Sequence, residues 1–268
     1  MRRKSLTILI IFATVLFIGY CSWQIITTLQ ERYLSKQEYE RTRESYVSAI
    51  TPPEETEEEE VVDDGWPKIT VDVEGLLAQN PDFTSWLYYE DAAINYPIVQ
   101  ETKLEMNKYL KTTFEGNSNP SGCAFIPFDA DPDFRYMNTF VYGHNMMNGT
   151  MFGTLKQVYQ YPAKCLNPYF YVWTREHETI KYRVIAAYVV DQSDEMYSIP
   201  LTAEAYSDYV NKALQHGAMN KYVPFEEAEK TAMNNAKPIV TLSTCYGAAG
   251  TSKRLLVQGV ELERKPFE

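Results

Sequence analysis

The chain has 268 residues, of which 45% are hydrophobic, and its formal net charge is -11 at pH 7. This length and apolar content suffice for one medium-sized domain with a substantial core and an appendage. The acidic balance argues against a protein that binds nucleic acid through bulk electrostatics, so no nucleic-acid partner is expected.

The first segment is apolar and long enough to cross a membrane. The basic residues 1–4 (MRRK) precede residues 5–26, which contain no charge. A helix of about 22 residues spans roughly 30 Å, the thickness of the hydrocarbon layer. The segment lacks an A-x-A cleavage pattern, which favours an uncleaved anchor over a signal peptide. We therefore predict a cytoplasmic tail over 1–4, a single-pass transmembrane helix over 5–26 in the lipid bilayer of the cell membrane, and an extracellular location for everything that follows.

Two further segments separate this helix from the folded domain. Residues 27–50 mix charges of both signs with apolar side chains, which predicts a juxtamembrane helix supported by charge pairs four residues apart. Residues 51–65 hold two prolines and eight acids but no base. Such a run repels itself and cannot bury apolar surface, so it predicts an extended acidic linker. The folded domain is expected to cover residues 66–268.

From Trp66 onward, most segments are typical of β-strands, being rich in aromatic and β-branched residues and separated by turn signals. The expected strands are 85–91, 94–100, 122–128, 138–144, 168–174, 179–190, 237–244 and 253–263. Helical patterns cover 73–80, 151–159, 202–217 and 225–236, with Thr202 as the cap of the third. The sequence thus predicts a mainly β fold, a barrel or a sandwich, with peripheral helices.

The cysteines point to a reactive thiol and not to a metal centre. Cys21 lies at the membrane edge, while Cys123, Cys165 and Cys245 lie in the outer domain. An odd number of cysteines in an exported domain suggests a free thiol, and whether Cys123 and Cys165 pair stays open. The chain has no CxxC or HxxxH spacing, so we expect no metal site and no cofactor.

One of the histidines stands out by its position. His144 follows the predicted strand 138–144 where it opens into a Gly- and Asn-rich loop, a common place to display a functional side chain. His177 lies in a charged turn and His216 at a helix end, both typical of solvated surface residues. Position alone leaves the functional role of His144 open.

Cys245 and Arg254 form the other candidate pair. Cys245 ends an apolar strand, a small-residue loop follows, and Arg254 enters the next strand. A guanidinium offers fixed donors to a thiolate or to an oxyanion that forms at a carbonyl. With His144 this set indicates nucleophilic acyl transfer. The alternative is a buried, inert thiol, since free cysteine is among the most buried residues.

These residues stand in motifs that resemble one family. TLSTC (Thr241–Cys245), the following Arg254 in KRLLVQG and the upstream YGHNM (Tyr142–Met146) resemble the signature of the sortases, membrane-anchored cysteine transpeptidases of Gram-positive bacteria. The segments NYPIVQ, NKYLKTTFEG and NGTMFGTL also resemble sortase segments. The resemblance covers about residues 66–263 and implies an eight-stranded sortase-type β-barrel. The helix at 202–216 and the N-terminal helical extension resemble class B.

The resemblance implies a role for each of three residues. Cys245 would attack the threonine carbonyl of a C-terminal sorting signal and form a thioester. His144 would be the general acid for the leaving amine and then the base for the incoming amine. Arg254 would hold the substrate and the developing oxyanion.

Five further residues are expected at the substrate. Ser243 and Thr244 line the end of the cysteine strand, and Leu110 matches a position near the substrate groove. Tyr142 shares a face with His144 if both lie on a strand, although a core role is equally open. Tyr246 departs from the family pattern, because several class B enzymes have an acid directly after the cysteine. The departure bears on substrate preference and not on the reaction.

The resemblance also implies the partners and leaves alternatives. The expected substrates are surface proteins with an Asn-Pro-x-Thr (NPxT) or Pro-Pro-x-Thr-Gly (PPxTG) type of sorting motif, and the expected acceptor is a peptidoglycan amine of a precursor or a cross-bridge. The alternatives are a pilus polymerase that uses a pilin lysine, a plain protease, and a non-enzymatic anchored binding module. The motif, the acceptor, the protonation of the Cys–His pair and the oligomeric state are not fixed by the sequence.

Overall fold

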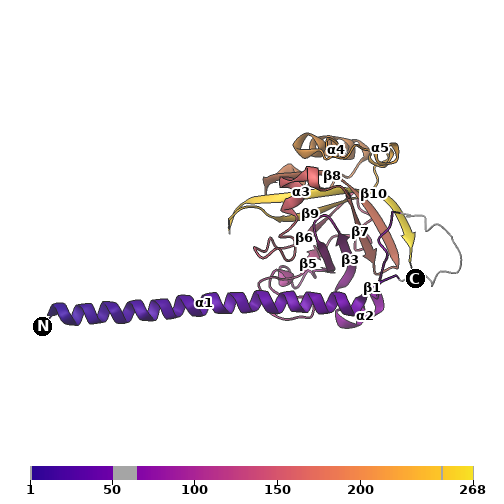
Figure 1. Cartoon of the computed structure of the whole chain (residues 1–268). Coiled ribbons are helices and arrows are strands. Elements are labelled where there is room, and N and C mark those ends of the chain that lie inside the picture. Colours follow the sequence, from indigo (N-terminus) through magenta and orange to yellow (C-terminus); the bar gives the residue numbers. More distant parts are fainter. Residues whose placement is uncertain (1, 51–64, 249, 268) are drawn as a thin grey trace.

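The computed structural model describes residues 2–50, 65–248 and 250–267, so the predicted acidic linker lies, except for Gly65, outside the described residues. A barrel carries helices on its outside, and one long helix projects from it (Figure 1). The predicted eight-stranded barrel is confirmed: its strands close in the order β10-β8-β7-β3-β4-β5-β6-β9.

The barrel strands follow the predicted segments closely. They are β3 (Phe83–Tyr89), β4 (Ile94–Gln100), β5 (Ala124–Ile126), β6 (Asn138–Tyr142), β7 (Tyr169–Thr174), β8 (Glu178–Asp191), β9 (Ile239–Cys245) and β10 (Lys253–Pro266). The pairs β4–β5 and β6–β9 are parallel, and the other neighbours are antiparallel. Side chains of successive residues point to opposite faces of a strand. On β9, Val240 and Leu242 accordingly join the barrel core, whereas Ile239 packs outside against the helical layer.

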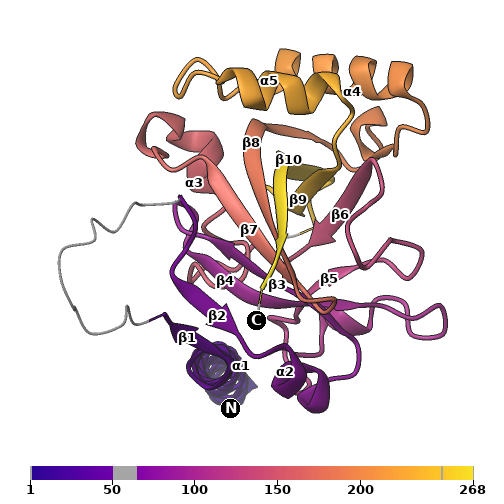
Figure 2. The ribbon, with the colours of Figure 1, turned by 90° about the vertical axis from the view of Figure 1, so that its right-hand side faces the viewer.

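Short helices cover the outside of the barrel. They are α2 (Val73–Gln79), α3 (Lys156–Gln160), α4 (Ala203–Gly217) and α5 (Glu227–Asn234), together with the 3₁₀ turns η1 (Lys108–Leu110), η2 (Pro162–Lys164) and η3 (Glu195–Tyr197). α4 and α5 form a layer over one side (Figure 2). Thr202 caps α4 as predicted, since its hydroxyl accepts a hydrogen bond from Ala205 N at 3.1 Å. The helix predicted over 151–159 begins only at Lys156.

The two predicted N-terminal helices form one continuous helix, and its second half is better packed than the sequence indicates. α1 runs without a break from Arg2 to Tyr46, and the chain then forms β1 (Val47–Ala49), which pairs with β2 (Ile69–Val71). The predicted juxtamembrane helix therefore ends four residues early, because these residues join a strand pair. Tyr39 is buried, donates to Gly122 O at 2.5 Å and meets the Tyr96 ring edge-on at 5.3 Å. The second half of α1 thus belongs to the folded domain, which begins well before residue 66.

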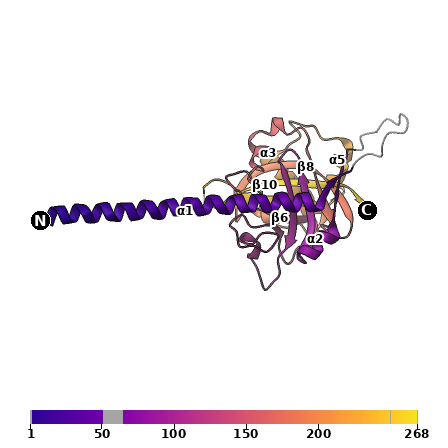
Figure 3. The same ribbon diagram turned by 60° about the horizontal axis from the view of Figure 1, so that its bottom comes forward.

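The first half of α1 is apolar and fully accessible. The helix is long and apolar enough to cross a membrane, and the most apolar part of it is not buried by the rest of the structure. Figure 3 shows α1 running along the barrel and projecting far beyond it. α1 thus agrees with the predicted N-terminal helical extension, and its first half has the length and composition of the predicted membrane-spanning helix.

A buried ion pair ties β8 to α5. Arg183 Nε donates to Glu229 Oε1 at 2.9 Å, and the two side chains are only 0% and 3% exposed. The remaining donors of Arg183 bind Val184 O and Val223 O. The hydroxyl of Tyr169 also donates to Glu229 Oε1 at 2.9 Å. Every charge in this cluster is therefore satisfied by hydrogen bonds, as burial of charged groups requires.

Candidate active site

Parallel pairing of β6 and β9 brings the histidine and the cysteine to the same level. Tyr142 is the partner of Ser243, and Gly143 N donates to Ser243 O at 3.1 Å. β6 ends at Tyr142, two residues earlier than the predicted strand, so His144 lies two residues beyond its end, and Cys245 lies two residues beyond Ser243 on β9. Cys245 is the last residue of β9 and is exposed. Residues 101 positions apart in the chain therefore lie at the same end of the barrel.

Two side chains brace the segments that carry His144 and Cys245. Asn145 Nδ2 donates to Cys245 O at 2.9 Å, and Thr244 Oγ1 donates to Gly143 O at 2.7 Å. Thr244 is 4% exposed and alternates with Cys245 along β9, so its side chain points away from the face that bears the thiol. Thr244 therefore lies in a bracing position and not on the face expected for substrate contact.

The ring of His144 is held by a backbone carbonyl. His144 Nε2 lies 2.8 Å from Leu110 O. A carbonyl oxygen can only accept, so Nε2 carries the proton of this bond and Nδ1 is the nitrogen left to exchange a proton. Leu110 ends η1, and its side chain packs against the barrel core. The residue thus reaches the site through its carbonyl group, a contact that no sequence pattern reveals.

Arg254 stands directly across from Cys245. The two residues are register partners on β9 and β10, so their side chains share a face. Arg254 Nη1 donates to Thr251 O at 2.7 Å and to Lys253 O at 3.0 Å, and Nη2 donates to Gln192 Oε1 at 2.8 Å. These bonds fix the guanidinium at the rim of the barrel. A guanidinium has five N–H groups, which leaves donors for a ligand.

An aromatic row lies on the face that Cys245 shares with Ser243. Tyr142 stacks between Phe125 and Phe140 at 5.5 and 6.2 Å, and Phe140 stacks on Tyr197 at 5.3 Å. The hydroxyl of Tyr197 hydrogen-bonds Ser243 Oγ at 2.7 Å. These rings form an aromatic floor that is partly exposed at Tyr142 and Tyr197 and reaches Ser243, two residues before Cys245.

Tyr197 was missed at the sequence level. Burial raises the pKa of Tyr197, the hydrogen bond with Ser243 and the charge of Arg254 lower it, and the charge of Cys245 raises it. The phenol thus lies within electrostatic reach of both residues. It sits in η3, more than forty residues before Cys245 in the chain, and no motif marks it.

Tyr246 connects the cysteine strand to α3. Its hydroxyl accepts from Gln160 Nε2 at 3.1 Å, and its ring meets Tyr159 edge-on at 5.6 Å. Tyr246 also packs against the barrel core. The residue where the chain departs from the family pattern therefore makes contacts beside the site.

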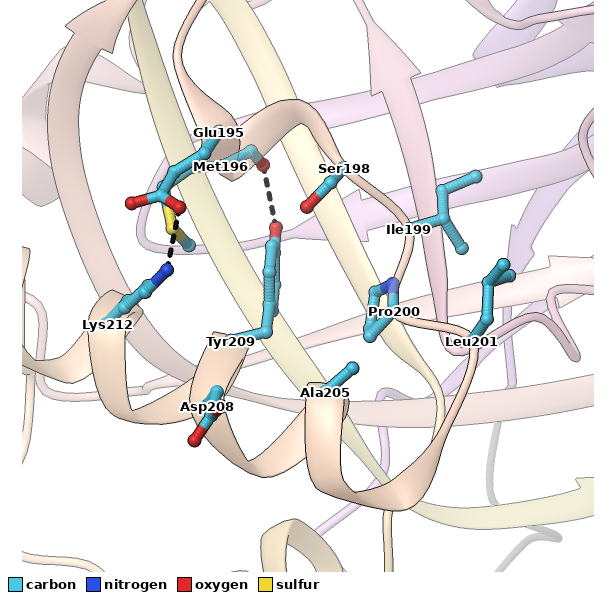
Figure 4. Close-up of a pocket in the computed structure, with 10 residues that line it drawn as sticks. All are labelled: Glu195, Met196, Ser198, Ile199, Pro200, Leu201, Ala205, Asp208, Tyr209 and Lys212. Carbon is cyan, nitrogen blue, oxygen red and sulfur yellow. Dashed lines mark hydrogen bonds and ion pairs between the residues drawn. The ribbon is translucent and has the colours of Figure 1, made fainter.

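A separate cavity of about 420 Å³ lies between η3 and α4 (Figure 4). Lys212 pairs with Glu195 at 2.6 Å across it, and Tyr209 donates to Met196 O at 2.9 Å. The cavity is lined by Glu195, Met196, Ser198, Ile199, Pro200, Leu201, Ala205, Asp208, Tyr209 and Lys212. None of the predicted site residues lines it, so it is distinct from the site at Cys245.

Cys245 differs from the other thiols of the barrel. Cys123 and Cys165 are both free and buried, so the disulfide that the sequence left open is not formed. Burial raises the pKa of Cys123 to about 12 and the pKa of Cys165 to about 11. The thiolate is the reactive form, so burial and the raised pKa both disfavour reaction at these two thiols.

We expect selective alkylation of Cys245 in the folded domain. Iodoacetamide at neutral pH should modify Cys245 at least ten times faster than Cys123 or Cys165, because those thiols are buried and protonated. Peptide mass mapping after timed quenching measures the three rates. The same reaction in denaturant is the control, in which the rates should converge. Slow labelling of Cys245 in the native protein would support the inert-thiol alternative.

The other two histidines lie at the surface, away from Cys245. His177 lies 3.5 Å from Glu74 at the surface, and the exposed His216 stacks on Tyr188 at 5.0 Å. Across residues 2–50, 65–248 and 250–267, no group of three or more His, Cys, Asp or Glu side chains is arranged to hold a metal ion.

The sequence matches the sortase domain family over residues 87–262. This match covers well over half of the chain, so the chain belongs to the sortase family. It is a class B sortase, a cysteine transpeptidase, because its relatives and structural neighbours are of that class.

The relatives are similar at moderate identity. Sortase B of Listeria monocytogenes is 28% identical over 189 residues, which cover 69% of this chain and 71% of the relative. Sortase B of Staphylococcus aureus is 23% identical over 261 residues, which cover 95% of this chain and 96% of the relative. The crystal structure of sortase B from Bacillus anthracis superposes with a TM-score of 0.66 at 22% identity and covers 88% of this chain and 99% of that one.

Proposed function

We propose that this enzyme cleaves a C-terminal sorting signal after threonine and transfers the surface protein to an amine of the peptidoglycan. The observation that carries the proposal is the exposed Cys245 with Arg254 as its direct cross-strand partner and His144 just beyond the end of the parallel strand β6. The similarity to a solved complex of Staphylococcus aureus sortase B with its substrate supports a peptide-processing role. The match covers 85% of the chain in that complex at a TM-score of 0.60.

The reaction divides into two acyl transfers. Cys245 Sγ attacks the threonine carbonyl, and the thiol proton passes through His144 Nδ1 to the leaving amine as the peptide bond breaks. The resulting thioester is attacked by the acceptor amine, whose proton returns through His144 to the released thiol. Arg254 donates N–H groups to the oxyanion of both tetrahedral intermediates.

The aromatic floor is the proposed binding surface for the sorting signal. Tyr142 and Tyr197 are the partly exposed members of this surface, Ser243 is buried beneath the Tyr197 hydroxyl, and Tyr246 lies on the side of α3. Leu110 contributes through the carbonyl that orients His144. Motifs of the NPxT or PPxTG type are the proposed ligands of this surface.

The enzyme is proposed to be a single-pass membrane protein with a cytoplasmic N-terminus and an extracellular catalytic domain. The support is the exposed apolar half of α1, preceded by a basic tail, and the similarity to a sortase B over 95% of the chain. This topology brings the enzyme, the exported substrate and the wall precursor to one side of the membrane.

Trapping of the thioester tests the proposed function. The purified enzyme is mixed with a pool of sorting-signal peptides, quenched in acid and analysed by peptide mass spectrometry. We expect Cys245 to carry the mass of a peptide cleaved after threonine, which identifies the nucleophile and the motif together. An adduct on another residue, or none with any peptide of the pool, would overturn the proposal.

A second candidate is pilus polymerisation with a pilin lysine as the acceptor. It is favoured by the similarity to a Streptococcus pyogenes class B sortase involved in pilus biogenesis, at 26% identity and a TM-score of 0.58. Purified pilin would then form a cross-linked ladder that depends on Cys245. A ladder that forms as well without the thiol, or no ladder with any pilin, would rule this out.

The brace between Asn145 and Cys245 gives a prediction for the reaction rate. Asn145→Ala removes the hydrogen bond to Cys245 O, so the cysteine segment is held less well beside His144. A neutral hydrogen bond contributes about 0.5–1.5 kcal/mol, which predicts a kcat lower by about 2- to 10-fold. Steady-state cleavage of a fluorogenic sorting peptide measures it. Asn148→Ala is the matched control, because Asn148 bonds only within its own loop.

A further inference from the structure

We propose that the barrel stands with its active-site end against the lipid bilayer, held there by α1 as a rigid strut, and that the loop around Met147 contacts the lipid headgroups. The inference rests on the proposed membrane anchor. It adds an orientation of the catalytic domain and a surface that faces lipid.

The first step is the continuity of α1. The helix extends from Arg2 to Tyr46 and contains neither proline nor glycine after Gly19. Sharp kinks in helices occur at such residues or at π-bulges. The apolar part and the part that packs on the barrel are therefore one continuous helix with no kink-forming residue at their junction, which sets the orientation of the barrel relative to the apolar part.

The second step is the short distance between the apolar part and the barrel. Asn119 Nδ2 donates to Glu31 O at 2.8 Å, and further along Glu38 accepts from Glu115 N at 3.1 Å and from Asn117 Nδ2 at 3.0 Å. Glu31 is five residues beyond Ile26, the last residue of the apolar segment, which corresponds to about 7.5 Å of helix. This spacing brings the barrel to the headgroup layer.

The third step is the direction in which the site faces. Figures 1 and 3 both show the paired ends of β9 and β10 as the part of the barrel that reaches furthest toward the N-terminus of α1. Cys245 and Arg254 lie at these ends. β10 then runs for 14 residues, roughly 45 Å of strand, to the opposite end beside residues 175–177. Cys245 therefore lies at the bilayer side of the barrel.

The fourth step is an uncharged loop with an exposed methionine at the same end. The loop that follows β6 contains no charged residue between Gly143 and Gly153, and Met147 within it is 84% exposed. An exposed apolar side chain among uncharged neighbours suits the interface of a bilayer. A substrate held at the membrane surface would thus meet Cys245 without any reorientation of the enzyme.

A fluorescence quenching experiment tests the orientation. The full chain carries Cys21→Ser and Cys245→Ala, plus either Met147→Cys or Glu176→Cys, and is labelled with bimane; the buried Cys123 and Cys165 stay unlabelled. It is reconstituted in vesicles of phosphatidylethanolamine and phosphatidylglycerol that contain headgroup-nitroxide lipid. We expect the label at 147 to lose more than half of its fluorescence, and the label at 176, at the far end of the barrel, to lose almost none.

An insertion in α1 tests whether the helix sets the distance between the barrel and the bilayer, and hence the quenching at position 147. Seven residues of helix inserted after Thr28 nearly preserve the helical phase and lift the barrel by about 10.5 Å, which should abolish the quenching at 147. Equal quenching at both labels, or quenching at 147 that survives the insertion, overturns the inference while the anchor stands. Failure of the full chain to float with vesicles overturns the proposed anchor and the inference with it.

Discussion

A Cys245→Ala variant is expected to lose cleavage and transfer of a sorting peptide by a factor of at least about 1,000, while it still binds the peptide. Without the sulfur no thioester forms, and the remaining groups offer only binding and an oxyanion site. The exposed side chain of Cys245 makes no packing contact that the fold needs, so the variant should melt at the wild-type temperature. Product formation is measured by chromatography of the quenched reaction, and peptide binding by calorimetry.

The matched control is Cys165→Ser, which alters a thiol of the same barrel away from the site. Cys165 is 4% exposed in the loop before β7, and its sulfur bonds only weakly to Tyr161 O. This variant should retain full activity once folded. Residual turnover by Cys245→Ala above one hundredth of the wild-type rate would show that another group performs the chemistry.

Much of the fold followed from local patterns because each barrel strand carries its own signal. Aromatic and β-branched runs between turn residues located all eight strands, and β4 (Ile94–Gln100) agrees to the residue. β5 is only three residues long, shorter than its apolar segment, because few of those residues find a partner strand. For a short strand such as β5, the length predicted from the local sequence pattern therefore exceeds the length that hydrogen-bonds to neighbouring strands.

The site was predictable only in part, because register and backbone contacts carry no sequence signal. Cys245, His144 and Arg254 were predicted from their places near strand ends and from the resemblance to sortase motifs, and the structure places them at one end of the barrel, while their catalytic roles stay predictions. The contact of His144 with the carbonyl of Leu110, and that of Tyr197 with Ser243, depend on loops folding over the barrel. A backbone carbonyl is present in every residue, so no composition or spacing singles it out.

The packed half of α1 escaped prediction for a related reason. Its mixture of charges resembles a solvated helix, yet Glu38 is 4% exposed. That carboxylate is buried because Glu115 N and Asn117 Nδ2 donate to it, and neither donor is recognisable from the sequence. A charge is assigned to solvent unless its partners are known, and here the partners lie almost eighty residues away.

Replacement of Glu229 by glutamine is expected to destabilise the fold by about 3–5 kcal/mol. Glutamine keeps the size of the side chain and an oxygen for Tyr169 and Arg183, but the charge of Arg183 then has no counter-ion at 0% exposure. Removal of one partner leaves the other charge uncompensated in a medium of low dielectric. The free energy of unfolding is measured by urea denaturation of the chain that starts after the apolar segment 5–26, followed by circular dichroism.

Glu227→Gln is the matched control on the same helix. Glu227 pairs with Lys230 at 2.6 Å, but its side chain is 88% exposed, so this change should alter stability by less than about 1 kcal/mol. A double variant, Arg183→Met with Glu229→Leu, removes both charges and should recover most of the loss. α5 leads directly into β9, so loosening of this helix is also expected to reach the strand that carries Cys245. If Glu229→Gln and Glu227→Gln change the free energy of unfolding equally, the buried Arg183–Glu229 pair contributes no more than a surface ion pair.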